Sequence, residues 1–145
     1  MYALASLLHA AVVWVSPRGR PVLDALAACG GSVESAQLFA VGLGFKNRHQ
    51  LARLLEREGL PVLEELAAWA RLLDWRLQWE RNQTGLCRLA IVSGLEPAVC
   101  YRTVKRLTGL PWTTVRDRSI EWTMTQLRAR CRIPQEVGLP SKFAS

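Results

Sequence analysis

AVGLGFKNRHQLARLLEREGLP, residues 40–61, and AIVSGLEPAVCYRTVKRLTGLP, residues 90–111, decide the fold, because the second stretch repeats the first at an offset of 50 residues. Three features coincide at this offset: Ala40 with Ala90, Gly44 with Gly94, and Gly59-Leu60-Pro61 with Gly109-Leu110-Pro111. Each stretch predicts a short helix, a break at glycine, a second helix and a Gly-Leu-Pro stop. The small alanine lets the two helices approach closely, and the glycine allows positive φ in the tight turn. The repeat therefore predicts two helix-turn-helix units.

Leucine and alanine dominate the rest of the chain, and apolar residues recur at spacings of three and four, which is typical of α-helices. We predict an all-α protein in which a long linker helix joins the two helix-turn-helix units and an extra helix follows them. The predicted segments are an N-terminal apolar segment with a short helix (1–31), the first unit (32–61), the linker helix (62–84), the second unit (85–111), and a C-terminal helix with a loose tail (112–145).

Three finer expectations accompany this division. Ser32 is predicted to be the N-cap of a helix over about 33–42. One continuous helix is predicted from Thr113 to about Arg132. The linker tryptophans are expected in the core rather than in a base-stacking role; they are Trp69, Trp75 and Trp79.

The N-terminal run MYALASLLHAAVVWV has no basic residue before it and is too short to cross a bilayer. We expect it to pack on the body of the protein as a helix or strand. The chain has four cysteines and two histidines but no C-x-x-C spacing, which disfavours a zinc site and predicts free thiols in a reducing compartment. We therefore expect a cytoplasmic protein with no membrane partner, no metal and no cofactor. The common catalytic motifs are also missing, so no enzyme activity is expected.

The charge of the chain points to a polyanion as its first partner. Among 145 residues, 19 Lys and Arg stand against 12 Asp and Glu, and the formal net charge is +7. Half of the residues are hydrophobic, which is typical of a folded globular chain.

The second helix of the first unit begins with a cluster of polar and basic residues. Side chains of these types hydrogen-bond guanine, adenine or phosphate in a major groove. The predicted base-reading residues of this unit are Lys46, Asn47, Arg48, His49, Gln50 and Arg53. A solvated polar face without a partner is the other interpretation of the same pattern.

The second unit has a weaker set at the equivalent place. Val99 and Arg102 are its predicted base-reading residues, and Glu96 would repel phosphate. Residues 102–132 contain eight Lys and Arg and two acids, so this part of the chain could follow the DNA backbone. The predicted phosphate contacts are Lys105, Arg106, Arg116, Arg118 and Arg128. An ordinary solvated helix would also explain these charges.

Residues from Ser32 to about Arg116 resemble the DNA-binding domain of AraC/XylS-type transcription regulators, in which one long helix joins two helix-turn-helix units. The segment GFKNRHQLARLLEREG is similar to the family's glycine-aromatic turn and Arg-bearing recognition helix. The resemblance implies a sequence-specific regulator that binds double-stranded DNA through two successive major grooves, with RNA polymerase or another regulator as a further partner. The chain departs from the family at Leu95, where an aromatic residue is usual, and in the helix and tail of 112–145.

A second class of function remains open. The apolar N-terminus and the C-terminal helix could form the partner surface of a helical protein-interaction module, with the basic charge incidental. The two hypotheses differ in whether the chain binds random duplex DNA with a steep dependence on salt.

Overall fold

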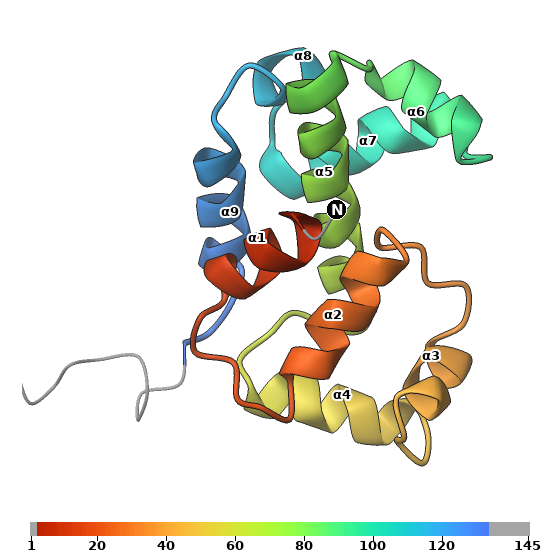
Figure 1. The fold of residues 1–145 in the computed structure, drawn as a ribbon, viewed down its shortest axis with the longest axis vertical. Helices are drawn as coiled ribbons and strands as arrows, with labels where there is room; N and C mark the ends of the chain where they lie inside the picture. Colours follow the sequence, from red (N-terminus) through yellow and green to blue (C-terminus); the bar gives the residue numbers. More distant parts are fainter. Residues whose placement is uncertain (1–2, 134–145) are drawn as a thin grey trace, which may run out of the picture.

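The computed structural model describes residues 3–133, and the predicted loose tail from Pro134 lies outside the described residues. Nine helices and no strand form within residues 3–133, which confirms the all-α fold class (Figure 1). The helices are α1 (Ala3–Ala11), α2 (Arg20–Ala28), α3 (Ala36–Gly42), α4 (Arg48–Arg57), α5 (Leu63–Asn82), α6 (Leu86–Val92), α7 (Pro97–Thr108), α8 (Trp112–Val115) and α9 (Ile120–Ala129). Within the N-terminal apolar run, residues Ala3–Ala11 thus form a helix and not a strand.

The 20-residue helix α5 lies between the two helix-containing ends of the molecule and contacts α1, α2, α7 and α9 (Figure 1). Ten of its residues are buried, including Trp69 and Trp75, because helices pack on more than one of its faces. α1 contacts α2, α5 and α9, while α3 packs on α4 and α6 packs on α7. We call α3 with α4 the first helix pair and α6 with α7 the second helix pair.

The N-cap of α3 differs from the prediction. Ser35 and not Ser32 takes this position, and the Ser35 hydroxyl accepts a hydrogen bond from the backbone N–H of Leu38 at 3.1 Å. α3 therefore begins at Ala36, three residues later than expected. Both serines satisfy the residue-type rule for an N-cap, and only the backbone geometry decides between them.

The predicted single helix from Thr113 to Arg132 is wrong, because the structure divides it into α8 and α9. Ser119 is the N-cap of α9. Its backbone is extended and so interrupts the helix, and its hydroxyl accepts a hydrogen bond from the N–H of Trp122 at 3.0 Å. The break lets Val115 on α8 and Leu127 on α9 both reach the core, where each is fully buried. A straight helix would not bring both to the same core.

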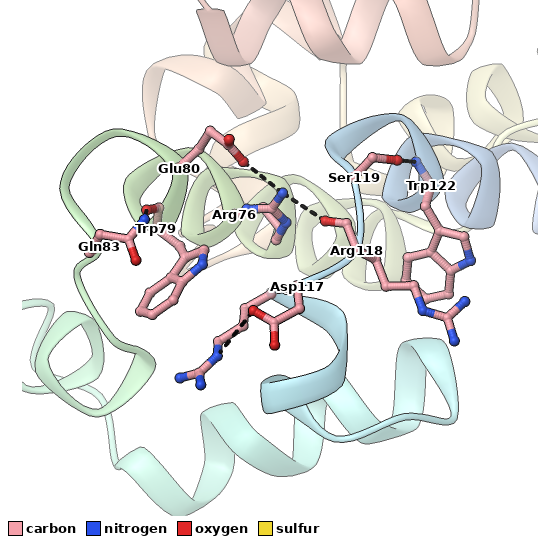
Figure 2. A network of polar contacts seen from close by, with 9 residues as sticks. Arg76, Trp79, Glu80, Gln83, Asp117, Arg118, Ser119 and Trp122 are labelled. Carbon is pink, nitrogen blue, oxygen red and sulfur yellow. Dashed lines mark hydrogen bonds and ion pairs between the residues drawn. The ribbon is translucent and has the colours of Figure 1, made fainter.

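A buried arginine ties the break between α8 and α9 to α5 (Figure 2). Arg76 is 2% exposed, and its Nη2 donates to Glu80 Oε1 at 2.9 Å and to the carbonyl oxygen of Arg118 at 2.8 Å. An arginine buried this deeply needs such partners to offset its lost hydration. The contact fixes where the chain turns from α8 into α9.

The C-terminal end of α4 is held by the segment between α1 and α2. Glu58 accepts two hydrogen bonds from Ser16, from the backbone N–H at 2.8 Å and from the hydroxyl at 2.5 Å. The indole N–H of Trp14 also donates to the carbonyl oxygen of Glu58 at 2.7 Å. Because bonds to a charged carboxylate are strong, this contact orients α4 on the body of the protein.

Candidate functional site

The two helix pairs turn in the same way. The N–H of Phe45 donates to the carbonyl oxygen of Ala40 at 3.0 Å, and the N–H of Leu95 donates to that of Ala90 at 2.8 Å. The glycine before each of these residues has positive φ, +91° at Gly44 and +73° at Gly94. These bonds are the helix-ending pattern that requires a left-handed residue. Both alanines are fully buried at the contact between the helices.

The repeat changes its offset inside the turn. α4 follows an N-cap at Asn47, three residues after its turn glycine, whereas α7 follows an N-cap at Glu96, two residues after its own. The second helices therefore correspond at an offset of 49. Leu51 and Leu55 of α4 match Cys100 and Val104 of α7, and all four are buried; an offset of 50 would instead match the buried Leu51 with the exposed Tyr101.

The corrected register aligns the exposed residues of the two helices. Arg53 and Arg102 each lie six positions after the N-cap, on the face opposite the buried residues. Arg57 corresponds in the same way to Arg106. Arg57 is not among the residues predicted to contact DNA, although its spacing of four from Arg53 places it on the same helical face.

Two of the predicted base-reading residues are occupied in capping α4. The side chain of Asn47 accepts a hydrogen bond from the N–H of Gln50 at 3.0 Å, and the side chain of Gln50 accepts one from the N–H of Lys46 at 2.6 Å. This reciprocal arrangement resembles a capping box. From α3, Gln37 Oε1 accepts a third hydrogen bond, from the N–H of Arg48 at 3.1 Å. The N–H groups of Arg48 and Gln50 in the first turn of α4 are thus satisfied within the protein.

The other predicted residues of α4 remain free of such roles. The side chains of Lys46, Arg48, His49 and Arg53 are exposed, and within residues 3–133 they form no hydrogen bond or ion pair. They give the start of α4 a concentration of positive charge with no acid before Glu56.

The start of α7 has a different surface. Val99 is 45% exposed, Ala98 beside it is exposed, and Arg102 follows on the next turn. Behind this surface lies Cys100, whose thiol has a raised pKa because it is buried, with the Arg71 charge acting in the opposite direction. Lys105 and Arg106 are exposed, as a role in phosphate binding requires.

Three of the predicted phosphate contacts are engaged elsewhere. Arg128 caps the C-terminal end of α1, with Nε 2.8 Å from the carbonyl oxygen of Ala11. The Arg116 guanidinium lies 4.6 Å from the centre of the Trp79 ring, and that of Arg118 lies 5.0 Å from the centre of the Trp122 ring. The labelled residues of Figure 2 show Arg118 over Trp122. These three side chains hold α8 and α9 in place and do not form one free basic flank.

A connected concave surface joins α4 to α7. One hollow, of about 230 Å³, is bordered by Arg48 and His49, and a central hollow of about 320 Å³ shares Ala36 and Leu63 with it. A third hollow, of about 490 Å³, lies along α7 and shares Thr103 and Arg106 with the central one. We call this surface the interhelical groove. Its two ends are basic, and its centre carries both acids and arginine: Glu34, Glu64 and Arg71.

The two candidate recognition helices also run in similar directions. In Figure 1, α4 and α7 both begin on the side of the molecule where α3 and α6 lie, and both run toward the opposite side. α5 separates them and, at 1.5 Å per residue, is roughly 30 Å long. The arrangement presents two helix N-termini to one side of the protein.

Comparison of the chain with protein-family models, with curated proteins and with solved structures finds no match. None of the helices within residues 3–133 is long and apolar enough to cross a membrane. The same residues contain no cluster of three or more His, Cys, Asp or Glu side chains that could hold a metal ion.

Proposed function

We propose that this protein binds double-stranded DNA sequence-specifically, as a transcription regulator with two helix-turn-helix units, α3–α4 and α6–α7. The observation that carries the proposal is the shared geometry of α4 and α7, which begin on one side of the molecule and border the same interhelical groove. The length of α5, roughly 30 Å, approaches the helical repeat of B-DNA, about 34 Å, which suits two helices that enter successive major grooves.

Cations on both helix pairs supply the charge that such binding needs. Lys46, Arg48 and Arg53 belong to the first helix pair, and Arg102, Lys105 and Arg106 belong to the second. All six side chains are exposed. A DNA-binding protein of this kind would act in the cytoplasm. The four free cysteines agree with this proposal, because thiols stay reduced in that compartment. It requires no catalytic group, and we propose a binding protein and not an enzyme.

The affinity for random duplex DNA should fall steeply with salt. With three to five phosphate contacts, a plot of log K against log salt concentration should have a slope of about −3 to −5. Arg53→Ala and Arg102→Ala, which change equivalent positions, should both weaken binding. Arg18→Ala removes an equally exposed arginine between α1 and α2 and should leave binding unchanged. Fluorescence anisotropy of a labelled duplex measures the affinity of the wild-type protein and of the three variants. An affinity that does not change with salt would exclude this function.

A helical protein-interaction module remains the second candidate because of four exposed aliphatic side chains. Val41 on α3 and Ile91 on α6 occupy equivalent positions in the repeat and are 49% and 65% exposed. Leu38 and Val92 extend these surfaces. If this function is the correct one, substitution of Val41 and Ile91 by serine should abolish partner binding, and random duplex DNA should not bind.

A further inference from the structure

The second helix pair differs from the first in the chemistry that it presents at equivalent positions. In the corrected register, His49 and Gln50 of α4 correspond to Ala98 and Val99 of α7. His49 can donate or accept a hydrogen bond, and Gln50, whose Oε1 caps α4, retains its amide nitrogen as a donor, whereas the two α7 residues present only methyl groups. Both α7 residues are exposed, and Val99 is 45% exposed.

The next turn of α7 strengthens this apolar character. The hydroxyl of Thr103 donates to the carbonyl oxygen of Val99 at 2.9 Å, so its hydrogen is used within the helix. Val99 and Thr103 both line the hollow along α7, together with the three cations of that helix. The small apolar surface of α7 is therefore surrounded by the positive charge of Arg102, Lys105 and Arg106.

Charge complementarity decides which partner fits this surface. α7 has three cations and no acid between Pro97 and Thr108, and the acidic N-cap Glu96 leaves the net charge positive, so a polyanion is favoured over an apolar protein surface. In a major groove, the apolar feature of a base pair is the C5-methyl group of thymine. A valine contributes no hydrogen bond there and gains energy by covering that methyl group.

We propose that α7 selects thymine by contact of Val99 and Ala98 with the C5-methyl group, while Arg102 anchors the helix in the groove. This inference rests on the proposed function and specifies what the second helix pair recognises. The two half-sites are then read by different chemistry: α4 uses hydrogen bonds and charge, and α7 uses apolar contact next to a single arginine.

Replacement of thymine by uracil tests the proposal, since uracil lacks only the C5-methyl group. A preferred duplex is first selected from random sequences, and uracil is then introduced into one half-site at a time. We expect roughly four-fold weaker binding for each contacted methyl group removed from the α7 half-site. The same replacement in the α4 half-site should change affinity less than two-fold.

Variants assign the effect to Val99. Val99→Ala should bind the thymine and uracil duplexes alike, whereas Val13→Ala, an equally large change at an exposed valine near α1, should keep the four-fold difference. Val99→Gln places the α4 residue type on α7 and should shift the preference at that base pair toward adenine.

The outcomes separate the two proposals. If a duplex is selected and binds tightly but uracil has no effect in either half-site, methyl recognition is wrong and DNA binding stands. If Val99→Ala leaves both the affinity and the thymine preference unchanged, Val99 does not face the bases, and the inference is overturned. If no duplex is selected and random DNA does not bind, the proposed function itself fails, and the apolar surface of α7 belongs to a protein interface.

Discussion

The two turn glycines are the residues on which the shape of each helix pair depends. A Cβ atom added to Gly44 would meet no other atom within 4 Å, so crowding does not explain why glycine is needed there. The cost of a side chain comes only from the positive φ of +91°. The same holds for Gly94 at +73°.

Gly44→Ala should therefore lower the free energy of unfolding by about 1–2 kcal/mol through backbone strain alone. Gly42→Ala is the matched control, because Gly42 lies two residues away, in a helical conformation and with the same open surroundings. It should leave stability unchanged or raise it by up to ~1 kcal/mol. Urea denaturation of both variants measures the difference, and equal effects would contradict the strain argument.

Cys131 gives the fold a dependence on alkaline pH. Burial raises the pKa of its thiol to about 11, with the Glu65 carboxylate raising it further and Arg128 opposing both. An unfolded thiol ionises near pH 8.5, so as the pH rises the unfolded chain loses this proton before the folded one does. The stabilisation is present below about pH 8.5 and is lost between about pH 8.5 and 11.

Cys131→Ala should consequently show a smaller loss of stability over that range than the wild-type protein, as measured by urea unfolding at pH 8, 9 and 10. Cys87→Ala, which removes an exposed thiol on α6, should keep the wild-type slope. A wild-type slope in Cys131→Ala would show that other groups cause the alkaline sensitivity.

At the scale of single elements, α4 combines capping and candidate binding residues within one turn. Asn47 holds the first position and Gln50 the last of this cap, and Arg48 and His49 lie exposed between them. The residue types alone predicted base contact for all four, because asparagine and glutamine serve both purposes. Only the backbone geometry shows that two of them hold the helix end.

Substitutions of Asn47 separate the two roles. Asn47→Ala should cost about 1 kcal/mol of stability through loss of the cap. Asn47→Asp retains the cap and the stability, but its negative charge should weaken binding of duplex DNA. Thermal unfolding and anisotropy, measured on both variants, test this. If Asn47→Asp binds DNA as the wild type does, Asn47 lies away from the phosphates.

Arg128 is another residue that was predicted to contact DNA but has a structural role, at the C-terminal end of α1. The basic run of residues 102–132 predicted a phosphate contact, but the guanidinium donates to the carbonyl oxygens of Ala10 and Ala11. The carbonyls of a helix end attract cations, and one from a distant helix serves as well as one from the same helix. A contact over 117 residues leaves no local signal in the sequence.

Arg128→Ala should therefore lower stability by about 1–2 kcal/mol and leave the salt dependence of DNA binding unchanged once the folded fraction is taken into account. Arg18→Ala, at an exposed position, should change stability by less than about 0.5 kcal/mol. A reduced salt slope in Arg128→Ala, with full stability, would restore the original assignment to phosphate binding.

For the whole molecule, the periodic features of the sequence were sufficient to predict the helical class, the glycine turns and a long helix between the two pairs, although α5 ends at Asn82 and not at residue 84. These features follow from the spacing of apolar residues and glycines along the chain. The break between α8 and α9 and the clamp of Glu58 on Ser16 depend on tertiary contacts, and the pattern of apolar residues continues through both. The repeat shifts to an offset of 49 because the turn before α7 is one residue shorter than the turn before α4. The sequence does not reveal this shift, since the stop signals at 59–61 and 109–111 still match at an offset of 50.

The rigid spacing of α4 and α7 leads to a prediction about the DNA site. Because α5 is a continuous helix, the two half-sites should be centred about 10 base pairs apart. Insertion of five base pairs between them turns one half-site to the opposite face of the duplex and should remove the contribution of one helix. Insertion of a full turn does not restore it, since α5 cannot lengthen. Undiminished binding to the five-base-pair insertion would show that only one helix reads the site.

The contact between α9 and α1 also sets an order of events during synthesis. α1 is synthesised before α9, and the arginine that caps α1 follows 117 residues later. At roughly 5–20 residues per second, translation takes some 6–23 seconds to supply that arginine. For this interval the carbonyls of α1 and the apolar residues that it buries against α9 have no native partner. The packing of α1 is therefore completed only after α9 has been made, and truncation of α9 would leave the C-terminal end of α1 without its cap.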